Sequence, residues 1–531
     1  MFQQGELSLA TRQVSQQEME ARLWDAADEL RNSMAEAQYS SVIFPLMFWK
    51  YLSDTWDHNH ELFLDAYEGL DDLSDEEADT IEYRDYQSFR IPLINRGKVD
   101  ETRASWSAIL KTVTQPGLNA RVRASLHAIE DANPDKFKRL FGRMTWTHEE
   151  ELDPTVLAGV MQAMNKVPPM HEGSMSHDVL GGAYEYLLKR FSDGSGTRAG
   201  QFFTPREVVN LIIEILRPSN FESVYDPTCG SGGMLIASAA QLKAHGGRPH
   251  TLHLFGQESV PDTAGVARMN LYMHNLTQFR VEIGDTLRAP KFKNPDGTIG
   301  RFDVIVANPP YSLKWTPWPA SDPRSIAMGG VASGKSADWA FVQHMIGSMK
   351  PGSGRAGVVL PHGVLFRGGS EADIRRKVVE EDLLEAVIGL PTNLFYNTTI
   401  ATCILIFRAP GTKGDSRKNE VLFIDASERY VKGKNRNNLR PQDVTDIVTA
   451  YSTGADPGRE GGVQLRLVPK AEIESNDFDL SITQYIRSSH DDEADLELLL
   501  RAYQEARKAR RHLEQHMMGA LAAVGVDFDD E

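Results

Sequence analysis

The chain has 531 residues, a length that predicts two or three domains rather than one core. Its composition, 41% hydrophobic and 25% charged, is typical of a soluble globular protein. No segment reaches the roughly 18 uninterrupted apolar residues that a membrane-spanning helix needs. The net charge of -17 argues against DNA binding through bulk electrostatics, so a DNA substrate would require a local basic surface or a partner.

The first residues and the cysteines indicate a cellular compartment. The start, Met1-Phe2-Gln3-Gln4-Gly5, lacks the basic and apolar regions of a secretory signal. The chain has 2 cysteines, Cys229 and Cys403, which are too few for a disulfide framework or a cysteine-rich zinc site. We therefore expect a protein of the reducing cytoplasm.

Residues 1–165 form the first region, which is mostly helical in pattern. Residues 18–53 carry apolar side chains at helical spacing, and residues 156–164 predict another short helix. Residues 71–80 are acidic and poor in large apolar groups, so we expect a surface stretch there. The pattern predicts a helical N-terminal domain.

Residues 166–430 form the second region, in which short apolar runs alternate with helical stretches. This alternation predicts an α/β fold with a mainly parallel, doubly wound sheet. Such sheets bind ligands at the carboxyl ends of their strands, so the residues that follow each run are candidates for a site. The expected strands are 223–225, 252–255, 280–283, 304–306, 357–360, 386–388, 403–407 and 421–424.

Residues 431–531 form a C-terminal extension. The chain is polar and irregular from about 432 to 436, and residues 491–524 are again helical in pattern. Apolar residues of this last stretch fall near one face, and basic residues are interleaved with them. The helix therefore serves either as a docking element for another subunit or as a helix packed on its own core.

A glycine-rich turn follows the first expected strand. Glycines allow a tight turn and a close approach to a ligand. The motif opens with an acid and differs from the G-x-G-x-x-G dinucleotide pattern, so it suits a cofactor with an ammonium group, such as S-adenosylmethionine. Asp226 is expected to accept from that ammonium, whereas a structural strand–helix turn is the alternative. The loop residues that we assign to the cofactor are Asp226, Thr228, Gly230, Ser231, Gly232 and Gly233.

Two more acids follow the next two expected strands. Glu258 stands where Rossmann-like sheets bind a ribose diol, and Asp285 is placed to reach the amino group of the cofactor's adenine. Each acid alone is more often a cap or a solvated loop residue. Acids at three successive strand ends together favour a nucleoside-containing cofactor.

The tetrapeptide Asn308-Pro309-Pro310-Tyr311 follows the strand expected at 304–306, and we assign Asn308 to the cofactor site as well as to catalysis. The Asn308 side-chain carbonyl and the Pro309 carbonyl can both accept from an exocyclic amino group and aim its nitrogen at an electrophilic methyl. Tyr311 offers a face for a flipped base. Catalysis then rests on positioning and electrostatics, without a metal or a covalent nucleophile. A structural proline-rich turn is the alternative.

These residues closely resemble the modification (methyltransferase) subunit of type I restriction–modification systems. The stretches 181–187, 200–205, 267–271 and 476–481 also look like that family. Its Phe-Thr-Pro segment helps to bind the cofactor, and the resemblance therefore assigns Phe203 and Thr204 to the cofactor site. Many members have Phe where Tyr311 stands, and either ring can stack.

The resemblance implies a helical N-terminal domain, a Rossmann-like methyltransferase domain and a C-terminal helical region. It implies methyl transfer from S-adenosylmethionine to the N6 amino group of adenine in double-stranded DNA. A separate specificity subunit would read the DNA sequence with two copies of this chain, and a restriction subunit could join them. In that arrangement the specificity subunit would supply much of the DNA contact that the acidic net charge of this chain does not favour. The resemblance implies no membrane partner.

Three other functions stay open at this stage. The tetrapeptide also occurs in methyltransferases for protein glutamine and RNA guanine, and a cofactor-binding scaffold without catalysis is the alternative of another class. Residues 329–336 formally match a G-x-x-x-x-G-K-S phosphate loop, but loop rather than strand precedes them. We expect instead a mobile loop beside the catalytic motif, with Lys314, Arg324 and Lys335 touching the DNA backbone.

Overall fold

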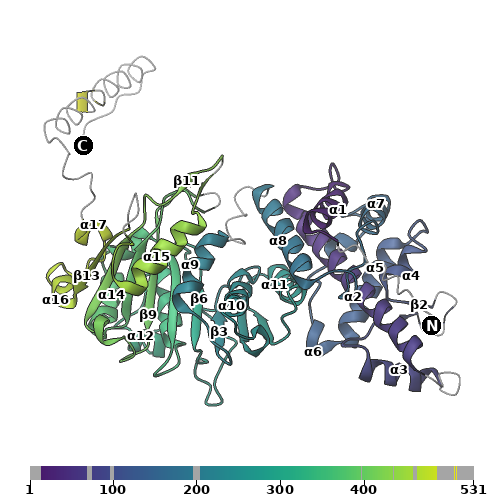
Figure 1. The fold of residues 1–531 in the computed structure, drawn as a ribbon, viewed down its shortest axis with the longest axis horizontal. Coiled ribbons are helices and arrows are strands. Elements are labelled where there is room, and N and C mark those ends of the chain that lie inside the picture. The colour runs from purple at the N-terminus through teal and green to yellow at the C-terminus, as the bar shows by residue number, and fades with distance from the viewer. Residues whose placement is uncertain are drawn as a thin grey trace, which may run out of the picture.

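A computed structural model gives the structure of the chain. It describes residues 14–67, 74–95, 98, 101–194, 204–395, 398–434, 436–457, 463–486, 507, 508 and 510. Figure 1 shows a helical part and a sheet-containing part that meet near α8 and α11. Phe203 and nearly all of the helix expected at 491–524 lie outside the described residues. In the part of the chain that is described, no helix is long and apolar enough to cross a membrane.

The N-terminal part is helical, as the sequence predicts. Its core surrounds α2, where the Trp49 indole donates to the Ala104 carbonyl at 2.9 Å. The short helix expected at 156–164 is α7, which begins with Asp153 as its cap and Pro154 in its first turn. The elements are α1 (Gln16–Asp28), η1 (Glu36–Gln38), α2 (Tyr39–Ala66), α3 (Asp75–Asp85), β1 (Leu93–Ile94), β2 (Thr102–Arg103), α4 (Trp106–Leu110), α5 (Leu118–Ala132), α6 (Pro134–Phe137), η3 (Thr145–Thr147), α7 (Pro154–Met164) and α8 (His177–Gly194).

A nine-stranded sheet forms the second part, and all eight expected runs are strands in it. The strand order is β13-β10-β8-β9-β7-β6-β3-β4-β5, with β9 and β13 antiparallel to their neighbours and the other pairs parallel. The strands are β3 (Ser223–Asp226), β4 (His253–Glu258), β5 (Phe279–Ile283), β6 (Val304–Ala307), β7 (Arg355–Pro361), β8 (Leu384–Gly389), β9 (Thr402–Arg408), β10 (Glu420–Asp425) and β13 (Gln464–Pro469). The expected α/β, mainly parallel fold is confirmed.

The order of the strands reverses beside β3. The chain runs from β3 outward to β4 and β5 on one side, and it then returns to β6 on the other side of β3. Loops leaving β3 and β6 therefore diverge, and a crevice opens between them at the carboxyl edge. Asp226 ends β3 and Asn308 follows β6, so this switch point brings the cofactor loop and the tetrapeptide together.

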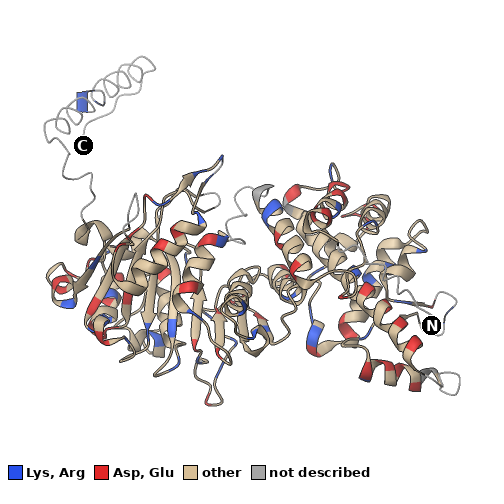
Figure 2. Ribbon diagram, viewed as in Figure 1, with Lys and Arg blue, Asp and Glu red and all other residues tan. Residues whose placement is uncertain are grey.

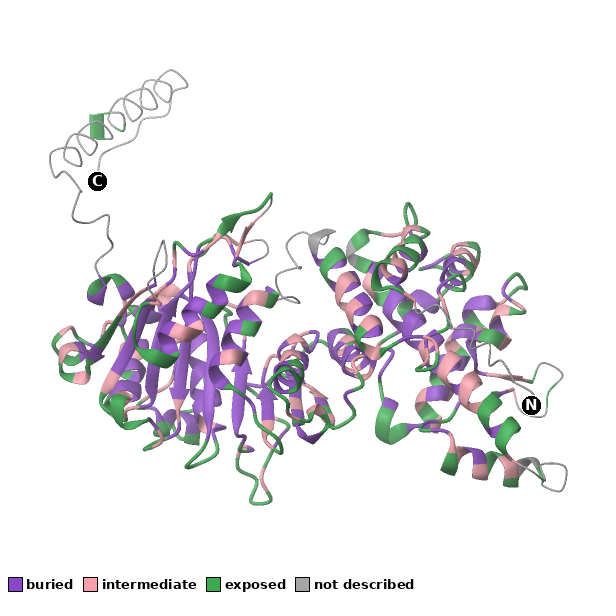
Figure 3. Ribbon diagram, in the orientation of Figure 1, coloured by how far each residue is buried: buried purple, intermediate pink, exposed green. Residues whose placement is uncertain are grey.

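Helices cover both faces of the sheet, whose central strands are buried (Figure 3). One face packs against α9 (Arg206–Leu216), α10 (Gly233–Ala244), α11 (Pro261–Met273) and α15 (Pro441–Thr453). The other packs against α13 (Asp338–Gly347), α14 (Ser370–Glu380), α16 (Lys470–Ser475) and α17 (Ile482–Tyr485), and α12 (Pro323–Ala327) lies against α13. Short 3-10 helices are η5 (Pro249–Thr251), η6 (His362–Leu365) and η7 (Asp415–Arg417).

Helix α11 joins the two parts. Met269 and Met273 on this helix belong to the core of the helical part, whereas other α11 residues belong to the sheet core. The Tyr184 hydroxyl of α8 donates to the Val266 carbonyl at 3.1 Å, which adds a polar link. The helical part is thus held against the side of the sheet that carries the cofactor loop.

The chain after residue 430 is more regular than the sequence indicates. The polar stretch forms a small hairpin of β11 (Val431–Lys432) and β12 (Asn437–Asn438), and β13 then adds an antiparallel edge strand to the main sheet. The described residues between β11 and β12 have no regular structure, as the sequence predicts, whereas the two short strands and β13 were not expected. The domain boundaries expected at 165 and 430 stay predictions.

Candidate active site

Two cavities lie at the carboxyl edge of the sheet, and both are lined by Thr228 and Asn308. The larger, of about 650 Å³, faces the loops after β4, β5 and β6. The smaller, of about 350 Å³, lies between the cofactor loop, α8 and α9. The first contains Glu258, Asp285, Pro309, Pro310 and Tyr311, and the second contains Thr204, Asp226, Gly230, Ser231 and Gly233.

The cofactor loop has the backbone that its glycines predict. Gly230 and Gly232 have φ of 52° and 82°, a left-handed conformation that residues with a side chain rarely adopt. The Cys229 amide donates to the Gln257 carbonyl at 3.0 Å, and the Asn270 side chain donates to the Ser231 carbonyl at 2.9 Å. These bonds fix the loop between β4 and α11, and Gly230, Ser231 and Gly233 line the smaller cavity.

Asp226 is buried beside this loop with only 2% of its surface exposed. One carboxyl oxygen accepts from the Thr228 amide at 2.9 Å, and burial raises the pKa of Asp226 to about 7. The Thr228 hydroxyl oxygen is also buried, and it has no hydrogen-bond partner among the described residues. A ligand that brings a cation to the carboxyl and a polar group to the hydroxyl satisfies both, which fits the amino-acid end of S-adenosylmethionine.

The two other acids lie in the larger cavity. Glu258 Oε1 accepts from the Val260 amide at 2.8 Å and from the Ser259 hydroxyl at 3.1 Å, whereas Oε2 accepts only from the Gly230 amide at 3.1 Å and keeps a lone pair for a hydroxyl. Asp285 uses one oxygen for the amides of Leu287 and Arg288, whereas the other oxygen lies 3.7 Å from the Arg288 guanidinium. The three acids thus follow successive strands around one crevice, as the sequence predicts.

The tetrapeptide is held from both ends of the Asn308 amide. Its nitrogen donates to the Thr204 hydroxyl at 2.9 Å, and its oxygen accepts from the Tyr311 hydroxyl at 2.8 Å. The Tyr311 ring meets Phe395 edge to face at 6.1 Å, and burial raises the pKa of Tyr311 well above its usual value. The phenol therefore keeps its proton and remains a donor.

Asp338 supports this loop, although no sequence motif distinguishes it as a site residue. It is fully buried at the start of α13, where its carboxylate accepts from the Ser312 amide at 2.9 Å and pairs with Arg367 at 2.6 Å. Ser312 has a φ of 52°, so the chain turns sharply after Tyr311. An acid at the start of an expected helix is an ordinary pattern, and only the tertiary contact reveals its role.

The loop at 329–336 is not a phosphate loop. Helix α12 rather than a strand precedes it, and Trp315 is bonded to it through the Ser333 carbonyl at 2.8 Å. Arg324 is 6% exposed and pairs with Asp322 at 2.9 Å, so the expectation that it contacts DNA is wrong. Lys314 and Lys335 are exposed, and Lys314 lines the larger cavity.

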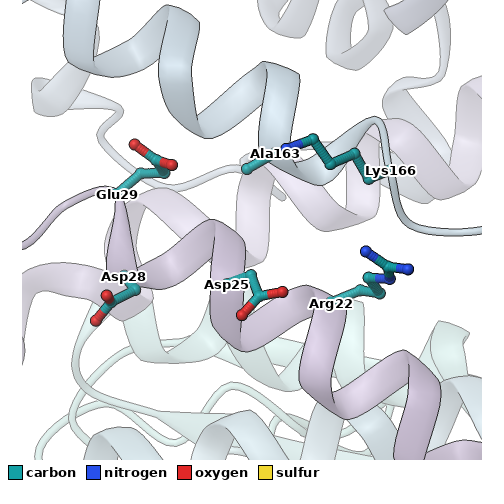
Figure 4. Close-up of a pocket in the computed structure, with 6 residues that line it drawn as sticks. All are labelled: Arg22, Asp25, Asp28, Glu29, Ala163 and Lys166. Atoms are coloured by element: carbon teal, nitrogen blue, oxygen red, sulfur yellow. The ribbon is translucent and has the colours of Figure 1, made fainter.

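A third cavity, of about 400 Å³, lies in the helical part beside α1 and the end of α7 (Figure 4). The side chains that line it include Arg22 and Asp25 of α1, Glu29 directly after α1, and Lys166 just after α7. Mixed charges of this kind are typical of a solvated cleft between surface helices. Among the described residues, no group of three or more His, Cys, Asp and Glu could hold a metal ion.

Comparison with known proteins identifies the family of the chain. The family model described as N-6 DNA Methylase matches residues 175–494, which is more than half of the chain. The chain belongs to the N-6 DNA methylase family. A second model, described as HsdM N-terminal domain, matches residues 19–164, so the helical part is also typical of this family.

Known relatives are methylase subunits of type I restriction enzymes. The MpnII methylase subunit of Mycoplasma pneumoniae is 26% identical over 96% of this chain and 97% of its own length. The HindI methylase subunit of Haemophilus influenzae is 33% identical over 61% of this chain and 72% of its own length. The solved methyltransferase subunit of a type I restriction-modification system from Streptococcus thermophilus has a TM-score of 0.76 and 29% identity, covering 89% of this chain and 100% of that one.

Proposed function

We propose that the chain is the catalytic subunit of a type I restriction–modification complex in the cytoplasm. It transfers a methyl group from S-adenosylmethionine to the N6 amino group of an adenine flipped out of double-stranded DNA. One observation carries the proposal: Asn308 lies where the two cavities meet, with the acids of three strand ends around it. The smaller cavity and the acids suit the cofactor, and the larger one also has room for a base beside Tyr311.

One set of residues binds the cofactor, and another set binds the target adenine. The bound cofactor supplies the electrophilic methyl group. Asp226 pairs with the cofactor's ammonium, Glu258 accepts from the ribose hydroxyls, and Asp285 accepts from the cofactor's adenine amine. Phe203, whose side chain lies outside the described residues, and Thr204 complete the cofactor side. Residues that contribute through the loop backbone or the hydroxyls are Thr228, Gly230, Ser231, Gly232 and Gly233.

On the substrate side, Asn308 and the Pro309 carbonyl accept from the adenine amine and hold its nitrogen toward the methyl group. Pro309 and Pro310 stiffen the loop that follows β6. Tyr311 stacks on the extruded base, whose removal from the helix would cost a few kcal/mol without such contacts. As the methyl group is transferred, the amine becomes cationic, and the amide and carbonyl oxygens stabilise that charge.

Sequence choice belongs to a separate specificity subunit in this proposal. The chain's net charge of -17 gives DNA little attraction by itself, so most phosphate contacts come from that partner. Two copies of the chain bind one specificity subunit, and a restriction subunit can join the complex. The C-terminal helix expected at 491–524 is the docking element in this arrangement.

The test is methyl transfer by the complex of the full chain with its specificity partner. We expect radioactive label from S-adenosylmethionine to appear in the adenine of duplex DNA, and long-read sequencing of host DNA to show the modified adenine within one motif. Label in protein or in RNA but never in DNA adenine would overturn the proposal. It would instead support methylation of protein glutamine or RNA guanine, the other chemistry that the tetrapeptide allows.

A further inference from the structure

Two hydroxyl groups from distant parts of the chain hold the Asn308 amide. Thr204 lies just before α9, and its oxygen is 2.9 Å from the amide nitrogen. Tyr311 lies three residues after Asn308, and its oxygen is 2.8 Å from the amide oxygen. Both contacts are partly buried, so water competes little for these groups. Neither contact is required for a cofactor site or for stacking of a base.

The two ends of an amide have nearly the same shape and opposite chemistry. A half-turn of the Asn308 side chain would place NH₂ where the oxygen stands. The two hydroxyls distinguish these orientations because they are unequal. A phenol is the more acidic hydroxyl and the better donor, whereas an aliphatic hydroxyl is the better acceptor. Tyr311 therefore favours the amide oxygen, and Thr204 favours the amide nitrogen.

The chosen orientation matters for the target amine. An amide oxygen can accept two hydrogen bonds, so Asn308 can accept from the adenine amine while it still accepts from Tyr311. In the opposite orientation the amide would direct N–H groups toward the N–H groups of adenine. That arrangement repels the substrate and leaves donors without acceptors.

We propose that Thr204 and the Tyr311 hydroxyl are positioning residues that fix the Asn308 amide with its oxygen toward the target amine. The inference rests on the proposed function, because it takes an amino group as the acceptor of methyl. It gives the Tyr311 hydroxyl a role separate from stacking by its ring. It also links the segment before α9, which borders the cofactor cavity, to the catalytic tetrapeptide.

The experiment uses the complex of the full chain with its specificity partner. The variants are Thr204→Val, which keeps the shape but removes the acceptor, and Tyr311→Phe, which keeps the ring. Thr204→Ser, which keeps the hydroxyl, is the matched control. Three quantities are measured: the single-turnover rate, the Kd for S-adenosylmethionine, and the ratio of Kd values for duplexes carrying purine or adenine at the target position. Purine lacks the amino group, so this ratio reports the Asn308 oxygen directly.

We expect Thr204→Val and Tyr311→Phe each to lower the rate by about fivefold, the effect of one ordinary hydrogen bond. Tyr311→Phe leaves the cofactor Kd unchanged, and Thr204→Ser retains most of the rate at saturating cofactor. In the double variant, the preference for adenine over purine falls toward one. A merely structural role would leave that preference unchanged.

Three results would overturn the inference. The double variant could keep the full preference for adenine, or Tyr311→Phe could weaken cofactor binding by the same factor as it slows transfer. The third result, an active complex whose rate is unaffected by either substitution, would contradict the inference alone. A wild-type complex that methylates no DNA adenine would instead contradict the proposed function and the inference with it. Tyr311→Phe removes a single atom, so its result stands even if Thr204→Val is poorly folded.

Discussion

Asn308 stands where the two cavities join, with Thr204 on one side and Tyr311 on the other. We predict that Asn308→Ala lowers the methylation rate by at least about a hundredfold, because it removes an acceptor aimed at developing positive charge. Binding of S-adenosylmethionine should persist, since the acids of the strand ends remain. Single-turnover assays and calorimetry measure the two effects. Unchanged turnover would mean that the tetrapeptide is structural.

The raised pKa of Asp226 predicts that affinity for S-adenosylmethionine depends on pH. Burial raises its pKa from 3.8 to about 7, so the folded chain favours the neutral carboxyl. The contribution of this carboxyl to folding stability is complete below pH 3.8 and is lost as the pH rises through about 7. An ammonium ligand needs the ionised form. Affinity for S-adenosylmethionine should therefore fall about tenfold for each pH unit below 7.

Calorimetry across this pH range measures that slope, and Asp226→Asn is the control. The amide cannot ionise, so the variant should bind the cofactor more weakly with little dependence on pH. The same slope in Asp226→Asn as in the wild type would assign the titration to another group. A flat profile in the wild type would show that Asp226 does not meet the ammonium.

At the scale of elements, Gly265 on α11 packs closely against the helical part. A Cβ atom there would lie 2.5 Å from the Leu140 carbonyl oxygen, a backbone atom that cannot move aside. We predict that Gly265→Ala destabilises the chain by about 1–3 kcal/mol, although alanine by itself favours a helix. Gly347→Ala on α13 is the matched control, because its nearest neighbour is a side-chain carbon at 3.7 Å.

Thermal unfolding of both variants measures this difference. Gly347→Ala should melt at or slightly above the wild-type temperature, whereas Gly265→Ala should melt lower. Equal melting temperatures would show that α11 can shift away from the helical part at little cost. In that event the contact between the two parts does not fix their arrangement.

The elements also show how far the sequence could predict the fold and the site. Buried parallel strands are short apolar runs bounded by turns, so all eight expected strands are present, and acids at three strand ends line the crevice. Strand β13 has mixed exposure and pairs only with β10, so its pattern carries little periodic signal. The bond from Asn308 to Thr204 spans 104 residues, and no local pattern could reveal it. The burial of Arg324 likewise depends on Trp318 and Asp322 in a loop.

For the molecule as a whole, the acidic net charge limits how strongly the chain can attract DNA without a partner. Acidic and basic residues are interspersed over both described parts (Figure 2), and the formal sum is -17. Attraction to DNA must therefore come from a few cations at the mouth of the crevice and from a partner. Lys314 lies at that mouth, exposed and lining the larger cavity, and no described residue forms an ion pair or hydrogen bond with its side chain.

We predict that the chain alone binds duplex DNA weakly at physiological salt and that the complex with its specificity partner binds tightly. Within that complex, Lys314→Ala should weaken binding to all sequences alike and reduce the slope of log affinity against log salt by about one, as loss of one phosphate contact does. Lys418→Ala is the control, because Lys418 is exposed just before β10, at the opposite edge of the sheet from Asn308. Fluorescence anisotropy over a series of salt concentrations measures both slopes. Equal slopes in the two variants would show that DNA does not contact Lys314 at the mouth of the crevice. The target base would then have to enter the catalytic pocket from another side.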